Sequence, residues 1–179
     1  MNILITILIV IAALIALFLI MALFIKKGYA LERETIINKP QGEVFNYIKH
    51  LRNQDNYSKW VMMDPAMKKS YTGTDGSVGF VYAWEGNKKA GKGEQEIVGI
   101  KEGERLDVEI RFIKPFEAIA RAPFITEAVA DNQTKVKWGL SSTMKYPMNG
   151  MLLFMNMDKL LGKDLETSLG NLKGILEKN

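Results

Sequence analysis

The stretch at residues 85–94, EGNKKAGKGE, comes nearest to a known chemical motif. Gly86, Gly91 and Lys92 satisfy the phosphate-binding pattern G-x-x-x-x-G-K-[ST] up to its lysine, and Gly93 stands where the pattern needs Ser or Thr. That motif binds phosphate between a strand and a helix, because backbone N–H groups and the helix N-terminus must converge on the anion. Both flanks, GFVYAW and EQEIVGI, read as strands. We therefore predict a hairpin turn in which Gly86 and Gly91 take positive φ and Gly93 allows a bulge.

Acid–base and nucleophilic chemistry has few candidates in this chain. His50 is the only histidine and lies close in sequence to Asp55, but triad members usually come from separate elements, and no G-x-S-x-G nucleophile elbow occurs. Glu94 and Glu96 share one face of a predicted strand, and they point to solvent if Ile97 points inward. Cysteine is absent, which excludes disulfides, thiolate catalysis and cysteine-based metal sites. We expect no catalytic residues.

An enzymatic interpretation would depend on Tyr82, Tyr71 or Arg111. The aspartates in MMDP and NMD are isolated, without a histidine cluster or the alternating Asp/Asn ladder of a calcium loop. We therefore expect no metal and no cofactor. The net charge of +4 is spread over scattered lysine pairs, which suits a domain near anionic lipid better than a nucleic-acid reader.

Residues 3–25, ILITILIVIAALIALFLIMALFI, form the most strongly marked element. The run carries no charge and one hydroxyl, and about 20 apolar residues suffice to cross a bilayer as a helix. It lacks the basic n-region and the small-residue cleavage site of a signal peptide. We predict a transmembrane anchor over residues 1–27. Because Lys26 and Lys27 follow the span, the positive-inside rule places the rest of this single-pass chain in the cytoplasm.

Residues 28–179 are expected to form one α+β domain. Residues 32–38 read as a strand, residues 41–51 place apolar side chains at helical spacing, and residues 52–61 read as a loop or a second short helix. From about residue 67 apolar and polar residues alternate in several segments with turn signals between them, which is typical of antiparallel strands. A final apolar stripe predicts a long terminal helix beginning near Pro147; its leucines are Leu161, Leu165, Leu169, Leu172 and Leu176.

This order of elements resembles the helix-grip fold. The segments INKPQGEVFNYIKHLRNQDNYSKW, GSVGFVYAWEGNKKAGKGEQEI, RFIKPF, TKVKWGL and DLETSLGNLKGILE are similar to the SRPBCC superfamily (START/Bet v 1-like), in its polyketide cyclase/dehydrase-like branch. The resemblance covers residues 32–177. It implies a curved antiparallel sheet of about seven strands, two short helices, and a long C-terminal helix over a cavity. In relatives that cavity takes up lipids, sterols, polyketides, quinones or other apolar molecules.

We therefore expect a membrane-anchored domain that binds an apolar small molecule or a lipid in an internal cavity, without catalysis. Methionines gather at the start of the terminal helix, where flexible thioethers either line the cavity or fill the core. Two alternatives stay open: a polyketide cyclase or dehydratase-like enzyme, and a protein-interaction module with a filled interior. The residues expected in the cavity wall are Tyr82, Trp84, Ile97, Phe112, Trp138 and Met155.

Overall fold

A computed structural model of the chain describes residues 2–178. Met1 and Asn179, the outermost residues of the predicted anchor and domain, lie outside the described residues. The helices and strands follow in this order: α1 (Ile3–Phe24), β1 (Gly28–Ile37), α2 (Gln41–Lys49), η1 (Leu51–Asn53), α3 (Gln54–Tyr57), α4 (Lys59–Met62), β2 (Lys68–Thr72), β3 (Val81–Glu85), β4 (Lys92–Lys101), β5 (Arg105–Lys114), β6 (Ala118–Arg121), β7 (Phe124–Ala130), β8 (Gln133–Thr143), η2 (Met148–Leu153) and α5 (Met157–Leu176).

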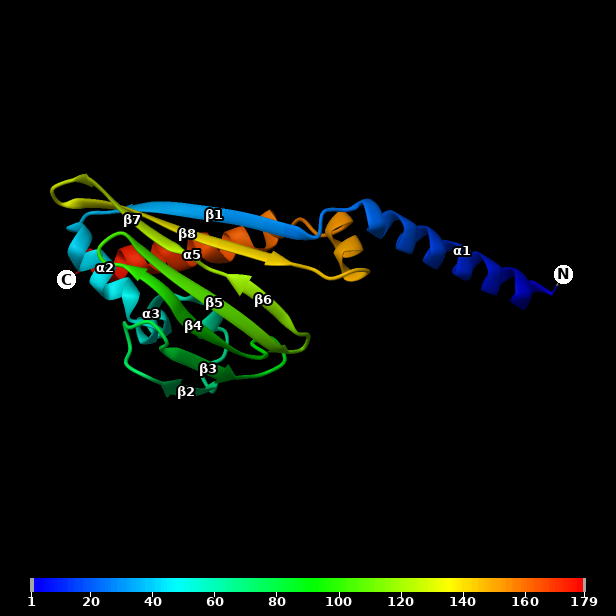
Figure 1. Cartoon of the computed structure of the whole chain (residues 1–179), viewed down its shortest axis with the longest axis horizontal. Coiled ribbons are helices and arrows are strands. Elements are labelled where there is room, and N and C mark those ends of the chain that lie inside the picture. Colours follow the sequence, from blue (N-terminus) through cyan, green and yellow to red (C-terminus); the bar gives the residue numbers. More distant parts are fainter. Residues whose placement is uncertain (1, 179) are drawn as a thin grey trace.

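The strands form one antiparallel sheet, in the order β1-β8-β6-β5-β4-β3-β2, with β7 pairing β5 and β8. The long helix α5 runs along β1, and α1 extends away from the sheet (Figure 1). This arrangement confirms the expected α+β helix-grip class. The sheet has eight strands rather than about seven, because β6 and β7 are separated at Pro123, which has no N–H to donate to a ladder.

Strand β1 begins earlier than expected, at Gly28 rather than Glu32. Its ladder with β8 runs without interruption from the pair Gly28↔Thr143 to the pair Ile37↔Thr134. Alternating exposure along β1 follows from this pairing, because one of its faces packs on α5.

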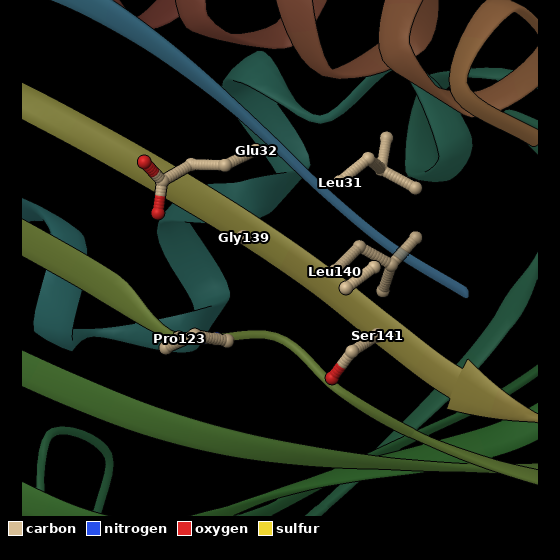
Figure 2. Close-up of a pocket in the computed structure, with 7 residues that line it drawn as sticks. Leu31, Glu32, Pro123, Gly139, Leu140 and Ser141 are labelled. Carbon is tan, nitrogen blue, oxygen red and sulfur yellow. The ribbon is translucent and has the colours of Figure 1, made fainter. Parts of the chain in front are cut away.

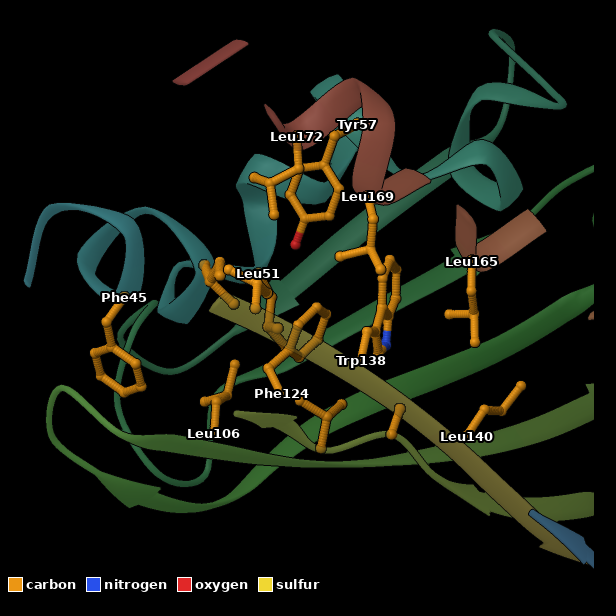
Figure 3. Close-up of a cluster of buried hydrophobic side chains, with 14 of the residues drawn as sticks. Phe45, Leu51, Tyr57, Leu106, Phe124, Trp138, Leu140, Leu165, Leu169 and Leu172 are labelled. Atoms are coloured by element: carbon orange, nitrogen blue, oxygen red, sulfur yellow. The ribbon is translucent and has the colours of Figure 1, made fainter. Parts of the chain in front are cut away.

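The terminal helix begins later than expected, at Met157 rather than near Pro147. The side chain of Asn156 accepts a hydrogen bond of 3.0 Å from the backbone N–H of Lys159 and so caps the helix. The preceding residues Met148–Leu153 form the separate 3-10 helix η2. The leucine stripe is confirmed: α5 buries it against the sheet and the short helices, with Leu161 half-buried (Figure 3).

The glycine-rich stretch is a hairpin turn between β3 and β4, as predicted. Gly91 has the predicted positive φ, at 66°, whereas the prediction of a positive φ at Gly86 is wrong. The register shifts between Lys92 and Gly93, so the predicted bulge is present. A Cβ on Gly93 would lie 2.7 Å from Cζ2 of Trp84, so this glycine makes room for the indole on the sheet.

Candidate functional site

The candidate site is the inner face of the sheet, the face that packs toward α5. Side chains alternate along a strand, so the registers place Tyr82 beside Gln95 and Ile110 on this face. The face is closed at the α2 end by a filled core in which Leu106, Phe124 and Trp138 lie beneath the leucines of α5 (Figure 3). A molecule held by this fold would therefore contact the remaining part of the inner face.

The residues predicted for the cavity wall lie on the inner face, with one exception. Tyr82, Ile97 and Trp138 are buried, and Trp84 and Phe112 are half-buried. The exception is Met155, which lies in the connection between η2 and α5 and donates its backbone N–H to Met151 O at 3.0 Å. The sheet register thus brings five of the side chains to one face, while their role as the wall of a cavity stays a prediction.

A group of half-buried side chains packs against the buried core at the inner face. We call it the inner strip. Trp84 and Phe112 pack edge to face with ring centroids 6.1 Å apart, and the Trp84 indole donates to Ala90 O at 3.1 Å. Trp60 packs edge to face on Trp138 at 5.7 Å, which joins the strip to the buried core. The members of the inner strip are Tyr29, Trp60, Trp84, Ile110, Phe112 and Leu161.

Two polar atoms at the buried end of the inner face have no hydrogen-bond partner among residues 2–178: the Tyr57 hydroxyl and Trp138 Nε1. The two rings lie edge to face with centroids 6.0 Å apart. Burial raises the pKa of Tyr57, so its hydroxyl stays protonated. An unpaired buried polar atom costs about 1–3 kcal/mol. The hydroxyl and the indole N–H are thus buried polar groups without a partner among the described residues.

Other polar groups at or beside the inner face are paired with each other. The Tyr82 hydroxyl donates to Asp55 Oδ1 at 2.8 Å, and Asp55 Oδ2 lies 2.8 Å from Lys69 Nζ. Burial, and then the hydrogen bond to Asp55, raise the pKa of Tyr82. Gln95 Nε2 donates to Gln54 Oε1 at 3.0 Å. The geometry therefore makes Tyr82 a protonated donor and holds Asp55 as a paired carboxylate.

Arg111 is on the outer face of the sheet, remote from this interior. Its guanidinium binds Glu94 at 2.7 Å, Glu96 at 2.7 Å and Glu109 at 3.0 Å, and these contacts raise its pKa further. The expectation that Glu94 and Glu96 point away from the interior is confirmed. The suggestion that Arg111 takes part in inner-face chemistry is wrong, because its position in β5 alternates with the inward side chains of Ile110 and Phe112.

Two surface depressions among the described residues lie elsewhere. One of about 410 Å³ sits where β1 and β8 pass the link between β6 and β7, and its lining includes Leu31, Pro123 and Leu140 (Figure 2). The second, of about 260 Å³, is lined in part by His50 and Tyr47. Neither contains a predicted wall residue. Because the Asp55 carboxylate is bound to Tyr82 and Lys69, it does not orient His50, whose Nδ1 lies 2.8 Å from Asn46 O.

Sequence reasoning missed Tyr57 and the Gln54–Gln95 pair. Tyr57 falls in RNQDNYSKWV, a polar stretch that reads as a loop, and only the packing of α3 against α5 shows that it is buried. Gln95 occupies an inward position of an alternating strand. A polar residue at such a position could have indicated a buried hydrogen bond from the sequence alone. Within residues 2–178, no group of three or more histidine and acidic side chains is placed to hold a metal ion.

Comparison with known proteins gives the fold. No protein-family model matches the chain, and no curated protein matches it. Truncated norcoclaurine synthase from Thalictrum flavum superposes with a TM-score of 0.66 at 8% identity, over 87% of this chain and 98% of that chain. TTHA0849 from Thermus thermophilus gives 0.61 at 16% identity, over 84% and 98%. Ara h 8.0201 gives 0.58 at 16% identity, over 85% and 99%. The chain therefore has the Bet v 1-like helix-grip fold, joined at its N-terminal side to an apolar helix long enough to span a membrane.

Proposed function

We propose that this chain is a membrane-anchored binding protein for a lipid or another apolar small molecule, held between the inner face and α5. The observation that carries the proposal is the inner strip beside the unpaired polar atoms of Tyr57 and Trp138. Ligand sites are usually built from apolar and aromatic walls with a few convergent polar groups. The ligand class that fits is an apolar molecule with one hydrogen-bond acceptor, such as an ester, carboxylate or ketone oxygen.

Membrane anchoring by residues 1–27 is supported by the surface of α1. Of its described side chains, that of Ala22 is buried, whereas large apolar ones such as Ile9 and Leu14 are about half exposed or more. A patch of this size is unfavourable in water and favourable in hydrocarbon. Lys26 and Lys27 at its end support a cytoplasmic domain spanning residues 28–179. An anchored domain of this kind samples the bilayer, where apolar ligands are concentrated.

The polar groups of the inner face favour binding over catalysis. Norcoclaurine synthase is an enzyme with this fold, so the fold itself does not exclude a cyclase or dehydratase-like activity. A general base must be free to accept a proton near its working pH. Here Tyr82 is a protonated donor, and Asp55 is paired with both Tyr82 and Lys69. Tyr82 and Asp55 are therefore better suited to orienting a polar group of a bound ligand than to acid–base catalysis.

Native mass spectrometry of the full chain, with extraction of its bound lipids, tests this proposal. We expect the chain purified in mild detergent to carry a bound apolar species. Ile110→Trp fills space on the inner strip and should reduce the bound fraction about tenfold, a loss of about 1.4 kcal/mol of binding free energy.

The matched control is Ile119→Trp, because Ile119 is 56% exposed and pairs with Arg111 on the outer face of the sheet. This variant should retain the bound species. A wild-type chain that carries no apolar species, or an equal loss in both variants at equal folding, contradicts the proposal.

A further inference from the structure

The 3-10 helix η2 is attached to the last turns of α1. Asn149 is buried, and its side-chain amide donates to Ala22 O at 2.7 Å and to Ile25 O at 3.1 Å. These carbonyls belong to the helix end, where the last four C=O groups have no partner within the helix. A Cβ on Gly150 would lie 2.7 Å from the Phe18 ring, so the glycine permits this close approach. The contact fixes η2 beside the segment from Phe18 to Ile25.

The position of η2 along α1 sets its depth in a membrane. The 22 residues of α1 measure about 33 Å, close to the hydrocarbon thickness of about 30 Å. From Phe18 to the helix end at Phe24 is about 9 Å. In a bilayer spanned by α1, η2 therefore lies at the level where acyl chains give way to headgroups.

The surface of η2 and the residues around it is suited to that level. The sequence from Tyr146 to Met157, YPMNGMLLFMNM, carries no charge. Its exposed side chains are large and apolar: Met148 is 52% exposed, Leu153 51% and Phe154 76%. Exposed lysines flank this level at Lys26, Lys27 and Lys145. Apolar side chains buried some 5–10 Å into the interface, with lysines beside anionic headgroups, are the features of a helix that lies on a membrane.

We propose that residues 146–154 lie in the interfacial layer of the bilayer that α1 spans, as a second, non-spanning membrane contact. This inference rests on the membrane anchoring stated under the proposed function, and it goes beyond that function because a flexible tether would also hold the domain near the bilayer. Two contacts joined by Asn149 and Gly150 fix the orientation of the domain. The start of α5 follows η2 closely (Figure 1). The same two contacts therefore also hold the start of α5 at the membrane surface.

Single-cysteine labelling tests the inference, because the chain contains no cysteine of its own. The full chain is reconstituted in vesicles of phosphatidylcholine and phosphatidylglycerol, with an environment-sensitive NBD label at Phe154→Cys, Leu14→Cys or Val129→Cys. Leu14 lies within α1, and Val129 is an exposed apolar residue near the end of β7. The turn between β7 and β8 lies at the end of the sheet far from α1 (Figure 1). Quenching is measured with nitroxides attached near the headgroup or along the acyl chain of the lipid.

We expect the label at position 154 to emit at shorter wavelength and to be quenched at least about twofold more by the shallow nitroxide than the label at position 129. The label at position 14 should be quenched by the deep nitroxide. If position 14 is quenched but position 154 behaves like position 129, the second contact is refuted and the anchor stands. If position 14 is not quenched, the anchor fails and the second contact fails with it.

Discussion

At the scale of single residues, we propose Tyr57 and Trp138 as the polar contacts of a molecule bound in the interior. Both side chains are buried, both pack on the same aromatic cluster, and their polar atoms are unpaired among the described residues. Tyr57 can donate or accept a hydrogen bond, whereas an indole N–H can only donate. A ligand that reaches them gains hydrogen bonds without breaking any that the described residues make.

Tyr57→Phe separates a ligand contact from a structural one. In the ligand-free protein this change removes an unpaired buried hydroxyl, so the free energy of unfolding should be unchanged or rise by about 1 kcal/mol. The affinity for the apolar ligand should fall about fivefold to tenfold, because a hydrogen bond is lost. Denaturant unfolding and a lipid-binding titration measure the two effects. A Tyr57→Phe protein that is less stable and binds equally well would show that the hydroxyl has a structural role.

Some of these residues could be predicted from the sequence and others could not. Alternation with period two suffices to place Tyr82, Ile97 and Trp138 on one face, since each strand has one buried side. Burial of Tyr57 depends on how α3 meets α5, a contact between segments far apart in the chain. Pattern reasoning has no access to such contacts.

At the scale of elements, Arg33 of β1 binds the first half of α5 through two ion pairs. The Arg33 guanidinium donates to Asp158 Oδ1 at 2.9 Å and to Glu166 Oε1 at 2.6 Å, two carboxylates on the first half of the helix. Gly162 lies between them in sequence, and a Cβ there would overlap the guanidinium. The helix can therefore approach the strand closely at this point.

The contribution of the Arg33–Asp158 ion pair to the free energy of unfolding should depend on pH in a defined direction. Arg33 lowers the pKa of Asp158, so the carboxylate stabilises the fold above its ordinary pKa and loses that contribution as the pH falls through the lowered value. We expect Asp158→Asn to lower Tm by a few degrees at most at neutral pH, since the pair is exposed. The difference from wild type should vanish once the pH lies below the lowered pKa.

Thermal unfolding at a series of pH values provides the measurement, with Asp131→Asn in the exposed turn between β7 and β8 as the control. A difference for Asp158→Asn that stays constant down to strongly acidic pH would contradict this explanation.

The elements themselves were largely predictable. Leucines spaced for one helical face were enough to identify the body of α5, and alternation identified the central strands. The start of α5 could not be predicted, because the Asn156 side chain caps the helix and Asn149 of the preceding η2 binds a carbonyl of α1. Both depend on hydrogen bonds that hydrophobic periodicity does not report.

At the scale of the whole molecule, the domain and its apolar helix meet in an ordered contact. η2 joins α1 to the start of α5 (Figure 1). The strand members of the inner strip lie on the inner face of the sheet. The fold was predictable because its order of elements is distinctive. The identity of the proposed ligand could not be predicted, because the inner face carries no sequence motif that specifies one.

Photo-crosslinking in membranes tests the central claim most directly, namely that a lipid or other apolar molecule occupies the inner face. A photoreactive benzoylphenylalanine is placed at Phe112 on the inner strip or at Val98, an exposed residue of the paired strand β4. After irradiation of the full chain in vesicles made from a total lipid extract, we expect a lipid adduct at position 112 at least about tenfold more abundant than at position 98. Equal labelling at the two positions, or no adduct at position 112, would contradict the account.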